Sequence, residues 1–395
     1  MARRKYGKQL KLALVHDWLD TWGGAENVLM DLRGAFPEAP VYTLVDFMDA
    51  RERALLGPGS ITTSTIQRLP GARLHFRRYL PLFSAAIRRF DLSGFDVIVS
   101  NSHAVAKFAR KATQQQLHIC YCHTPMRYAW DLRDRYLAES GLDGGATGML
   151  ARTILAHLRR QDLAGNDGVD KFIGNSHFIA ERIRRCYDRD ADVVHPPVDT
   201  DRFRPGETRG EHYLTVSRLV PYKQVNAIVA AFAQMPDRRL VVAGGGPMLA
   251  ELRTTAPPNV ELLGHVPAAE LVPLMQGARA FVFAAEEDFG IAPLEAQACG
   301  LPVIALERGG VMETILANNA ALTGVFFSES TPSAIADAIA RFEAGPAIDP
   351  DACRRNALRF SRHRFRDEFR AYVTQSWTAF RARPERPSPQ VQRTA

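Results

Sequence analysis

One stretch of the chain decides its fold class, and it reads Ala284-Ala-Glu-Glu-Asp-Phe-Gly-Ile-Ala-Pro-Leu-Glu-Ala-Gln-Ala-Cys-Gly-Leu-Pro302. It predicts a strand that ends, a loop that contains a glycine, and a helix that begins near Pro293, because proline suits the first turn of a helix. Exposed backbone amides at such a helix start favour an anionic phosphate or a sugar hydroxyl. Glu287 lies in the loop and Glu295 on the helix. The stretch therefore predicts a ligand site, and a helix start with capping acids is the plainer alternative.

Short apolar runs alternate with helical patterns along the rest of the chain, which is typical of βαβ units and parallel sheets. The runs end near Gly, Ser or Pro, so loops cluster at the carboxyl ends of strands, where open α/β sheets bind ligands. The predicted fold class is α/β, with two Rossmann-like doubly wound domains that face each other across a cleft. The expected strands are 12–16, 97–100, 118–122 and 171–174 in the first half, and 213–217, 240–243, 260–263, 280–284 and 302–305 in the second.

The domain organisation follows from length and from one break in the pattern. A chain of 395 residues exceeds what a single core usually supports, so two domains are expected. The break falls where His195-Pro-Pro-Val-Asp199 and the polar run from Arg204 interrupt regular structure. We therefore expect a first domain at 1–205 and a second at 206–360. The proline-rich end, 384–395, is expected to be a disordered tail.

The positive charge is concentrated in the first half of the chain. Residues 1–205 hold 30 basic and 23 acidic residues and residues 206–395 hold 20 of each, so the first half carries the whole net charge of +7. A basic face attracts nucleic acid, anionic lipid headgroups or an anionic substrate, and a solvated surface is the plain alternative. Nucleic acid is disfavoured because no stacking aromatics interleave with the basic residues. The arginines that contribute to this excess include Arg73, Arg77, Arg78, Arg88 and Arg89.

Other classes of protein are disfavoured by features that the sequence lacks. No apolar run approaches the roughly 20 residues of a membrane span, and the run after the basic start is too short for a signal peptide. Five cysteines without a CxxC pair favour buried, reduced thiols in the cytosol. The four Asp-x-Asp pairs lie in a polar hinge, a linker and a late loop, so no metal site is expected.

The motifs together resemble the GT4 family of retaining glycosyltransferases, which have the two-domain GT-B fold. The Glu-x7-Glu element followed by Ala-x-Ala-Cys-Gly-Leu-Pro is the most characteristic match. The resemblance implies that the first domain binds the acceptor, that the second binds the donor, and that a last helix at 361–383 crosses back to the first domain. Further pieces resemble family motifs in the same order: the loop Gly23-Gly24-Ala25-Glu26, the linker 198–203, the element 217–223, the turn 243–247 and the stretch Gly264-His265-Val266.

The resemblance assigns roles to particular residues. Arg218 and Lys223 would stabilise the diphosphate released from a nucleotide sugar, since fixed positive charge is needed where that charge develops. Lys223 is the only lysine after Lys171, which favours a role that arginine does not fill, and a solvated loop pair is the alternative. Glu287 would orient sugar hydroxyls. The residues implied in donor binding are Gly23, Gly24, Gly264, His265, Val266, Phe289, Gly290, Ile291 and Glu295, of which the last would hold the ribose hydroxyls.

The first half supplies the remaining candidates. By resemblance, His123 contacts the transferred sugar, and a structural histidine is the alternative. His16 and Asp17, at the end of the first expected strand, are candidates for the acceptor side. Two Asn-Ser-His stretches, 101–103 and 175–177, are each expected at a strand end and helix start, where Asn or Ser caps the helix.

Two stretches resemble, more narrowly, the mannosyltransferases of O-antigen and exopolysaccharide assembly: Val15-His-Asp-Trp-Leu19, and Tyr121-Cys-His-Thr-Pro125 with Tyr128-Ala-Trp130. The expected function is metal-independent, retaining transfer of a hexosyl group, mannose from GDP-mannose, to a glycan or lipid-linked glycan acceptor in polysaccharide or lipopolysaccharide biosynthesis. No cofactor is expected beyond the nucleotide-sugar substrate. The expected location is the cytoplasm, with peripheral binding to the anionic cytoplasmic face of the inner membrane.

Two other functions fit the same architecture. A nucleotide-sugar 2-epimerase shares the GT-B fold, although Arg218 and Lys223 together with the Glu-x7-Glu element favour the transferase. A non-catalytic nucleotide-sugar-binding subunit of an assembly complex is disfavoured because polar residues are intact at every motif.

Overall fold

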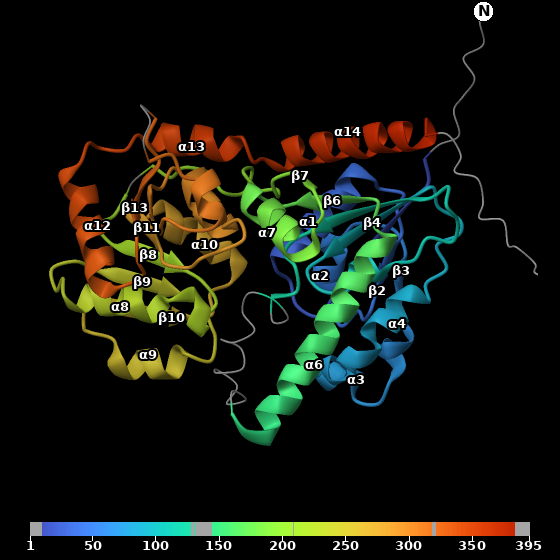
Figure 1. Cartoon of the computed structure of the whole chain (residues 1–395). Coiled ribbons are helices and arrows are strands. Elements are labelled where there is room, and N and C mark those ends of the chain that lie inside the picture. The colour runs from blue at the N-terminus through green and yellow to red at the C-terminus, as the bar shows by residue number, and fades with distance from the viewer. Residues whose placement is uncertain (1–9, 128–129, 131–143, 208, 318–320, 384–395) are drawn as a thin grey trace, which may run out of the picture.

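The computed structural model describes residues 10–127, 130, 144–207, 209–317 and 321–383. Within these residues the chain forms two parallel β-sheets, each covered by helices on both faces (Figure 1). The predicted fold class, α/β with two doubly wound domains, is therefore confirmed. The expected tail at 384–395 and Tyr128 of the Tyr-Ala-Trp motif lie outside the described residues.

The first domain is built on a seven-stranded sheet in the order β3-β2-β1-β4-β5-β6-β7, with parallel pairing throughout. Both faces are buried because side chains alternate along each strand: Ala13 and Val15 join one apolar cluster, and Leu12 and Leu14 join the other. Its strands are β1 (Leu12–His16), β2 (Val41–Thr43), β3 (Ile61–Thr63), β4 (Val97–Ser102), β5 (Leu117–Cys122), β6 (Lys171–Gly174) and β7 (Ala191–Val193). Its helices are α1 (Gly24–Ala35), α2 (Ala50–Leu55), η1 (Thr65–Arg68), α3 (Ala72–His75), η2 (Phe76–Leu82), α4 (Phe83–Arg88), η3 (Ala106–Phe108), α6 (Gly145–Ala164), η5 (Gly165–Gly168) and α7 (His177–Tyr187).

The second domain has a six-stranded parallel sheet in the order β10-β9-β8-β11-β12-β13. Its two apolar clusters again lie on opposite faces, with Val242 and Val282 in one and Val241 and Phe281 in the other. Its strands are β8 (Tyr213–Val216), β9 (Leu240–Ala243), β10 (Val260–Gly264), β11 (Ala280–Phe283), β12 (Val303–Leu306) and β13 (Gly324–Phe327). Its helices are η6 (Pro221–Lys223), α8 (Val225–Ala233), α9 (Leu249–Thr255), α10 (Ala268–Gln276), α11 (Ile291–Ala298), η7 (Gly310–Glu313), α12 (Pro332–Ala344) and α13 (Pro350–Leu358).

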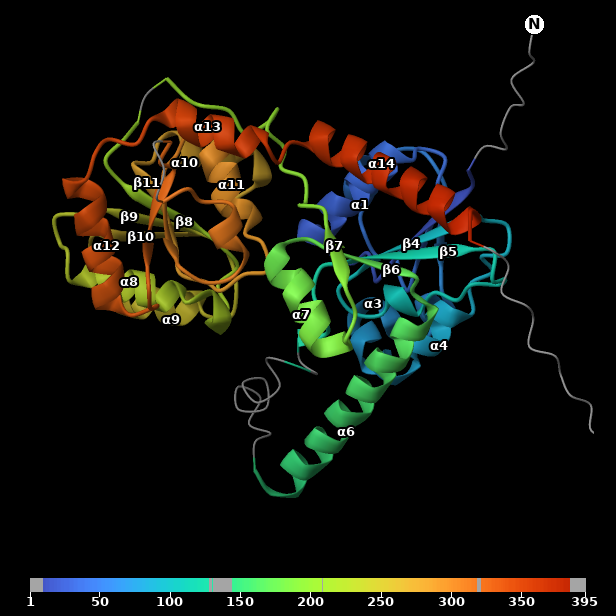
Figure 2. The ribbon, with the colours of Figure 1, turned by 45° about the horizontal axis from the view of Figure 1, so that its top comes forward.

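The last helix, α14 (Arg362–Arg381), lies on the first domain although it follows the second in sequence (Figure 2). Phe365, Phe369 and Val373 are buried in the same apolar cluster as β1 and α1. Arg362 Nε donates to Asp31 Oδ2 of α1 over 2.9 Å. The first domain thus incorporates a segment from the far end of the chain.

Four short strands at or next to the edges of the sheets escaped the sequence analysis, whereas the edge strand β10 was predicted. β3, β7 and β13 are edge strands and β2 lies next to one, and each has only three or four residues. Several of their residues are half-buried or exposed. β2, β3 and β7 contain polar residues and carry no continuous apolar run, which was the signal used for the predicted strands, whereas the run Val325-Phe-Phe327 of β13 was overlooked.

The capping interpretation of the two Asn-Ser-His stretches is wrong for the first and correct for the second. Asn101 and Ser102 are still part of β4, which runs two residues further than expected. Ser176, by contrast, accepts a hydrogen bond from Ile179 N over 3.1 Å and caps α7. The helix expected near Pro293 begins slightly earlier, at Ile291.

No helix within the described ranges is both long and apolar enough to cross a membrane.

Candidate active site

The loop between β11 and α11 carries two carboxylates to the interface of the two domains. Lys223 Nζ contacts Glu287 Oε1. Arg127, which follows β5 of the first domain, contacts Asp288 Oδ2, and its Nη2 lies 4.0 Å from Glu287 Oε2. The structure therefore brings the predicted Lys223 and Glu287 together and adds a cation from the opposite domain.

Lys223 is positioned by a short turn that leads into α8. It ends the single turn η6, and Gln224 then adopts a left-handed conformation (φ 54°) before the helix begins. Burial, followed by the positive charge of Arg127, lowers the pKa of Lys223 to about 8, against the opposing effect of Asp288. Two cations held near each other in a partly buried site form a suitable place for a polyanion such as a diphosphate.

Arg218 lies in the loop after β8 and its side chain is exposed. Its guanidinium makes no hydrogen bond or ion pair with any residue that the structure describes. It precedes Lys223 by five residues, but no contact joins the two side chains within the described chain. Its predicted role as a second phosphate-binding cation thus depends on movement of an unrestrained side chain.

Glycines let the loops after β8, β9 and β10 approach one another closely. Gly244 and Gly246 have φ angles of 151° and 156°, and a Cβ on Gly244 would lie 1.8 Å from the carbonyl oxygen of Ser217. Gly244 N donates to Gly264 O over 2.7 Å. His265 is exposed beside Gly245, where a Cβ would lie 3.6 Å from the His265 Cβ. Gly264, His265 and the half-buried Val266 thus sit at the same carboxyl edge of the sheet as Lys223.

The start of α11 faces the glycine loop of the first domain. Gly290 precedes the helix in a left-handed conformation (φ 87°), which a residue with a side chain adopts only with strain. A Cβ on Gly24 would lie 3.4 Å from Ile291 Cδ1. Gly23 is the residue before α1 and has an extended backbone. Two helix starts, those of α1 and α11, therefore meet at the interface and direct their amides toward it.

Phe289 in the loop before α11 and Glu295 on α11 are the remaining donor-binding candidates of this segment. Phe289 is buried in an interdomain cluster, stacked on His195 with ring centroids 5.4 Å apart. Burial raises the pKa of Glu295 to about 7, with Arg202 of the linker opposing this effect and Asp199 adding to it. No hydrogen bond or ion pair joins Glu295 to Glu287 within the described residues.

A hydrogen-bonded chain of side chains lies at the carboxyl edge of the first sheet. Asn101 Nδ2 is 3.1 Å from His16 Nδ1, and its Oδ1 is 2.7 Å from His123 Nε2. Asn101 Nδ2 also donates to Ala25 O over 2.9 Å, and His16 Nε2 is 3.2 Å from Glu26 Oε1. The Gly-Gly-Ala-Glu loop, β1 and β4 thus jointly hold His123.

His123 is a neutral imidazole in this setting. Burial, and then the neighbouring rings of His103 and His16, lower its pKa to about 3, with Asp17 opposing. Because Asn101 donates through its amide nitrogen to His16 and Ala25, its oxygen accepts the proton of His123 Nε2. Nδ1 of His123 is therefore the acceptor nitrogen, suited to a hydroxyl donor.

Asp17 is fully buried and serves the backbone. Its carboxylate accepts hydrogen bonds from the amides of residues 103–106, with N–O distances of 2.5–3.0 Å. His103 Nδ1 lies 2.9 Å from Asp17 Oδ2. Burial alone would raise the pKa of Asp17, but the charge and hydrogen bonds of His103 hold it well below its usual range. Asp17 therefore fixes the loop after β4, and its two oxygens are occupied.

Further contacts clamp the two domains together at this site. Arg182 Nη1 of α7 donates to Asp288 Oδ1 over 2.8 Å, and Ser176 Oγ donates to the Asp288 carbonyl over 2.5 Å. Asp288 thus pairs with Arg127 and Arg182 at once. The loop that holds Glu287 is fixed by the first domain as well as by its own.

Glu313 of η7 caps α7 of the opposite domain. It accepts hydrogen bonds from His177 N over 2.9 Å and Phe178 N over 3.0 Å, and it pairs with His195 Nε2 at 2.9 Å. Burial would raise the pKa of Glu313, but these hydrogen bonds, that of His195 first, lower it. His177, His195 and Glu313 are also close enough to ligate a metal. The positive end of α7 disfavours a cation there, so we interpret the group as an interdomain cap.

Two family models match the chain: Glycosyltransferase Family 4 over residues 22–202 and Glycosyl transferases group 1 over residues 198–360. The chain belongs to the GT4 family of GT-B glycosyltransferases. A "D-inositol 3-phosphate glycosyltransferase" of Mycobacterium leprae is 34% identical over 172 residues, which are 37% of this chain and 40% of that protein. The chain thus spans less than half the length of the curated relatives it matches.

Solved structures support the GT-B fold. Anabaena HepE, crystallised with UDP and glucose, has a TM-score of 0.69 at 18% identity and covers 93% of this chain and 100% of its own. Sucrose-phosphate synthase from Thermosynechococcus elongatus has a TM-score of 0.70 at 18% identity, with coverage of 94% and 100%. At this identity the likeness concerns the fold alone.

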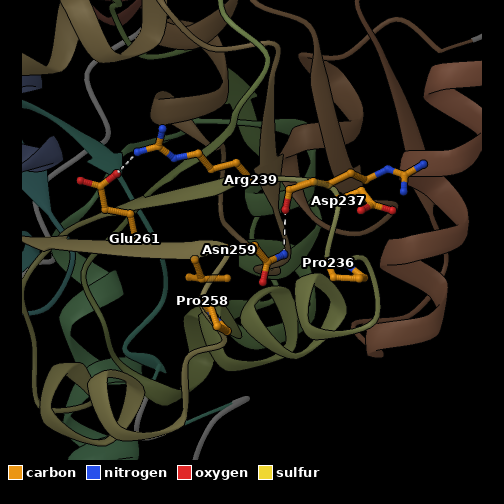
Figure 3. A pocket seen from close by; sticks show the side chains of 8 residues that line it. Pro236, Asp237, Arg239, Pro258, Asn259 and Glu261 are labelled. Atoms are coloured by element: carbon orange, nitrogen blue, oxygen red, sulfur yellow. Dashed lines mark hydrogen bonds and ion pairs between the residues drawn. The ribbon is translucent and has the colours of Figure 1, made fainter.

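A hollow elsewhere in this GT4 protein does not compete with the interface as a site. It is lined by residues before and at the start of β9 and β10, among them Asn259, Arg239 and Glu261 (Figure 3). Arg239 and Glu261 pair at 2.6 Å, and the Asn259 amide donates to three backbone carbonyls. It lies at the amino ends of the strands, whereas open α/β sheets bind ligands at the carboxyl ends.

Sequence reasoning missed four side chains of the GT4 site. Asn101 was dismissed as a helix cap, although an Asn directly after an apolar strand was a usable signal. Arg127, Asp288 and Glu313 interact across the domain interface, with partners 161, 161 and 118–136 positions away in the chain. No local pattern reports contacts of that range.

Proposed function

We propose that this GT4 protein is a retaining glycosyltransferase that moves a hexosyl group, mannose from GDP-mannose, onto a glycan or lipid-linked glycan acceptor of polysaccharide or O-antigen assembly. The observation that carries the proposal is the meeting of Lys223, Glu287 and the start of α11 opposite the glycine loop of the first domain. The name of the mycobacterial relative supports sugar transfer in general. The mannosyl donor rests on the two stretches around His16 and His123 that resemble mannosyltransferases.

Lys223 would stabilise the leaving diphosphate. A diphosphate bound beside it would compete with Glu287 for the ammonium group and would release that carboxylate to the hydroxyls of the sugar. The amides at the start of α11 and the exposed Arg218 would add further positive potential. Binding and activation of the donor would thus be coupled through one ion pair.

His123 would face the transferred sugar as a hydrogen-bond acceptor rather than as a cation, since its pKa is lowered to about 3. His16 and Asp17 have their polar atoms engaged within the protein, so we assign them positioning roles in place of direct acceptor contact. Retention would follow from attack on the face of the leaving group. The acceptor oxygen bonds to the anomeric carbon, the bond to the phosphate oxygen breaks, and the departing phosphate takes the acceptor's proton.

A panel of nucleotide sugars tests this function. We expect GDP-mannose to raise the melting temperature more than UDP-, ADP- or dTDP-sugars at equal concentration, because a ligand that binds the folded state stabilises it by mass action. Release of GDP should require added acceptor. Preference for a UDP-sugar would contradict the mannosyl donor, and conversion of the sugar to its 2-epimer would contradict transfer itself.

The pH dependence of the reaction rate should show the titration of Lys223. Its ammonium is charged below its pKa of about 8 and neutral above it. We therefore expect kcat/KM for the donor, which reports the free enzyme, to fall as the pH rises through about 8. In Lys223→Arg this decline should disappear, because arginine stays charged. A decline that persists unchanged in that variant would assign it to another group.

Activity should survive EDTA. Fixed cations and helix-start amides would supply the charge that a metal supplies in other glycosyltransferases. The measurement is the initial rate before and after chelation, with Mn²⁺ or Mg²⁺ added back. Loss of activity that either ion restores would overturn metal independence.

We place the enzyme in the cytoplasm. All five cysteines are buried and none forms a disulfide, which suits a reducing compartment. A lipid-linked acceptor would bring it to the cytoplasmic face of the membrane.

A further inference from the structure

Exposed apolar side chains gather on one side of the first domain. Leu74 is 80% exposed, Met149 71% and Leu150 61%. Leu82 and Ile154 are each about half exposed. They belong to α3, η2 and α6, which share one apolar cluster with α4 through Phe76 of η2, Phe83 of α4, and Leu155 and Leu158 of α6. Both views show α6 beside α3, with its N-terminal end projecting beyond the domain (Figures 1 and 2).

The same elements hold a concentration of positive charge. Residues 64–90 contain six arginines and residues 144–161 contain three, and neither segment contains an Asp or Glu. The positive charge of these two segments alone is larger than the net charge of +7 of the whole chain. Those on the surface of the elements named above, all exposed, are Arg73, Arg77, Arg78, Arg88, Arg89, Arg152, Arg159 and Arg160.

The apolar stripe of α6 continues past the part of the helix that packs on the domain, so its N-terminal members are exposed. Leu155 and Leu158 point into the domain, whereas Met149, Leu150 and Ile154 are exposed. Leu150 and Ile154 are four residues apart, so they lie one above the other on the helix surface. An exposed apolar stripe flanked by arginines is the pattern of a helix that lies in a lipid headgroup layer.

The arginine-rich elements also adjoin the loop that Asp17 fixes at the carboxyl edge of the first sheet. Trp18, directly after Asp17, packs on Phe76 of η2 and Phe83 of α4, with ring centroids 5.9 and 6.1 Å apart. Trp18 also contacts His103, with ring centroids 4.6 Å apart. The exposed surface is thus continuous with the carboxyl edge of the first sheet.

We propose that α3, η2, α4 and the N-terminal half of α6 form a docking surface for an anionic lipid bilayer, into which Leu74, Leu82, Met149, Leu150 and Ile154 insert. The arginines would bind lipid phosphates and the apolar side chains would enter the headgroup layer. The exposed side chains of this surface are aliphatic, which favours lipid as the partner over nucleic acid, because nucleic acid binds through stacking on aromatic side chains. A bilayer here would lie beside the carboxyl edge of the first sheet. Docking does not depend on the proposed sugar transfer, and its test measures membrane binding alone.

The test is co-sedimentation of the full chain with vesicles of phosphatidylcholine alone or mixed with phosphatidylglycerol, at about 0.1 M and about 1 M salt. We expect binding to the anionic vesicles that weakens with salt. The triple variant M149Q/L150Q/I154Q should bind at least tenfold more weakly at both salt concentrations. The triple variant R73Q/R78Q/R89Q should lose binding at low salt and differ little from the unmodified protein at high salt.

The matched control replaces two exposed leucines elsewhere, L55Q/L358Q, which should leave vesicle binding unchanged. Melting temperatures of all variants should agree within a few degrees, because each replaced side chain is exposed. Equal affinity for neutral and anionic vesicles, or no affinity for either, would overturn the proposal. So would a dimer in light scattering that M149Q/L150Q/I154Q converts to a monomer, since a second copy would then cover the surface.

Discussion

Replacing Lys223 by alanine should lower the turnover number on the order of 10²-fold or more, which is the usual cost of removing one preorganised contact to developing charge. Glu287 holds the Lys223 side chain at the domain interface, and the positive charge of Arg127 acts on it. A cation from solvent would therefore not easily take the place of the missing ammonium group. The measurement is kcat from donor-saturated initial rates. Arg218→Ala should act in the same direction, and the exposed position of Arg218 predicts a smaller effect.

Two further variants show whether the charge or the fold is responsible. Lys223→Arg retains the charge but not the compact ammonium, so its turnover should lie between those of the unmodified enzyme and Lys223→Ala. Lys171→Ala removes a lysine that pairs with Asp192 at 3.8 Å on the far side of the first domain, and it should leave kcat within about twofold, as surface pairs contribute little. Unchanged turnover in Lys223→Ala would remove this residue from the mechanism.

Asp17→Ala should be the most damaging single substitution for stability. The carboxylate is buried and accepts hydrogen bonds from four backbone amides in addition to its contact with His103. Leaving a buried donor without an acceptor costs about 1–3 kcal/mol, so four such donors bring the loss of unfolding free energy to at least about 4 kcal/mol. That is comparable with the total stability of many domains, about 5–15 kcal/mol. We expect poor yield or a large drop in the urea midpoint.

Two control variants, Asp17→Asn and a substitution of the exposed Asp91, show how much of the loss comes from the buried carboxylate. Asn keeps one acceptor oxygen, so the variant should fold and lose roughly half as much stability. Asp91→Ala removes an exposed carboxylate that accepts a hydrogen bond from Ser93 N, and it should leave the urea midpoint almost unchanged. If Asp17→Ala unfolds at the same urea concentration as Asp91→Ala, the buried carboxylate does not organise this loop.

The sign of the pH effect follows from the lowered pKa of Asp17. A carboxyl whose pKa is lower in the folded than in the unfolded state stabilises the fold above its unfolded pKa, which is about 3.9 for aspartate. This contribution should therefore be constant near neutral pH and decrease as the pH falls below about 4. Asp17→Asn should lack that part of the acid dependence.

Much of the fold was predictable because it is encoded locally. Buried parallel strands produce short continuous apolar runs, and glycines mark the loops at their carboxyl ends, so eight inner strands, the edge strand β10 and the doubly wound class could be predicted from residues close in sequence. The same holds for the element that contains Glu287, Gly290 and Glu295, where strand, loop and helix follow one another within 20 residues. The short edge strands β3 and β7 lacked this signal, because part of their surface faces solvent.

The contents of the site were decided by tertiary structure. Lys223 and Glu287 are 64 residues apart, and Arg127 and Asp288 are 161 apart, so only the packing of two domains brings them into contact. Asn101 gains its role because β4 extends two residues further and lies between β1 and β5 in the sheet. The sequence showed the basic residues of the first half, but it did not show that they lie beside the exposed apolar side chains of α6. Composition and periodicity report burial and local conformation, whereas the partners of a polar side chain are set by chain topology, which joins residues that no local pattern relates.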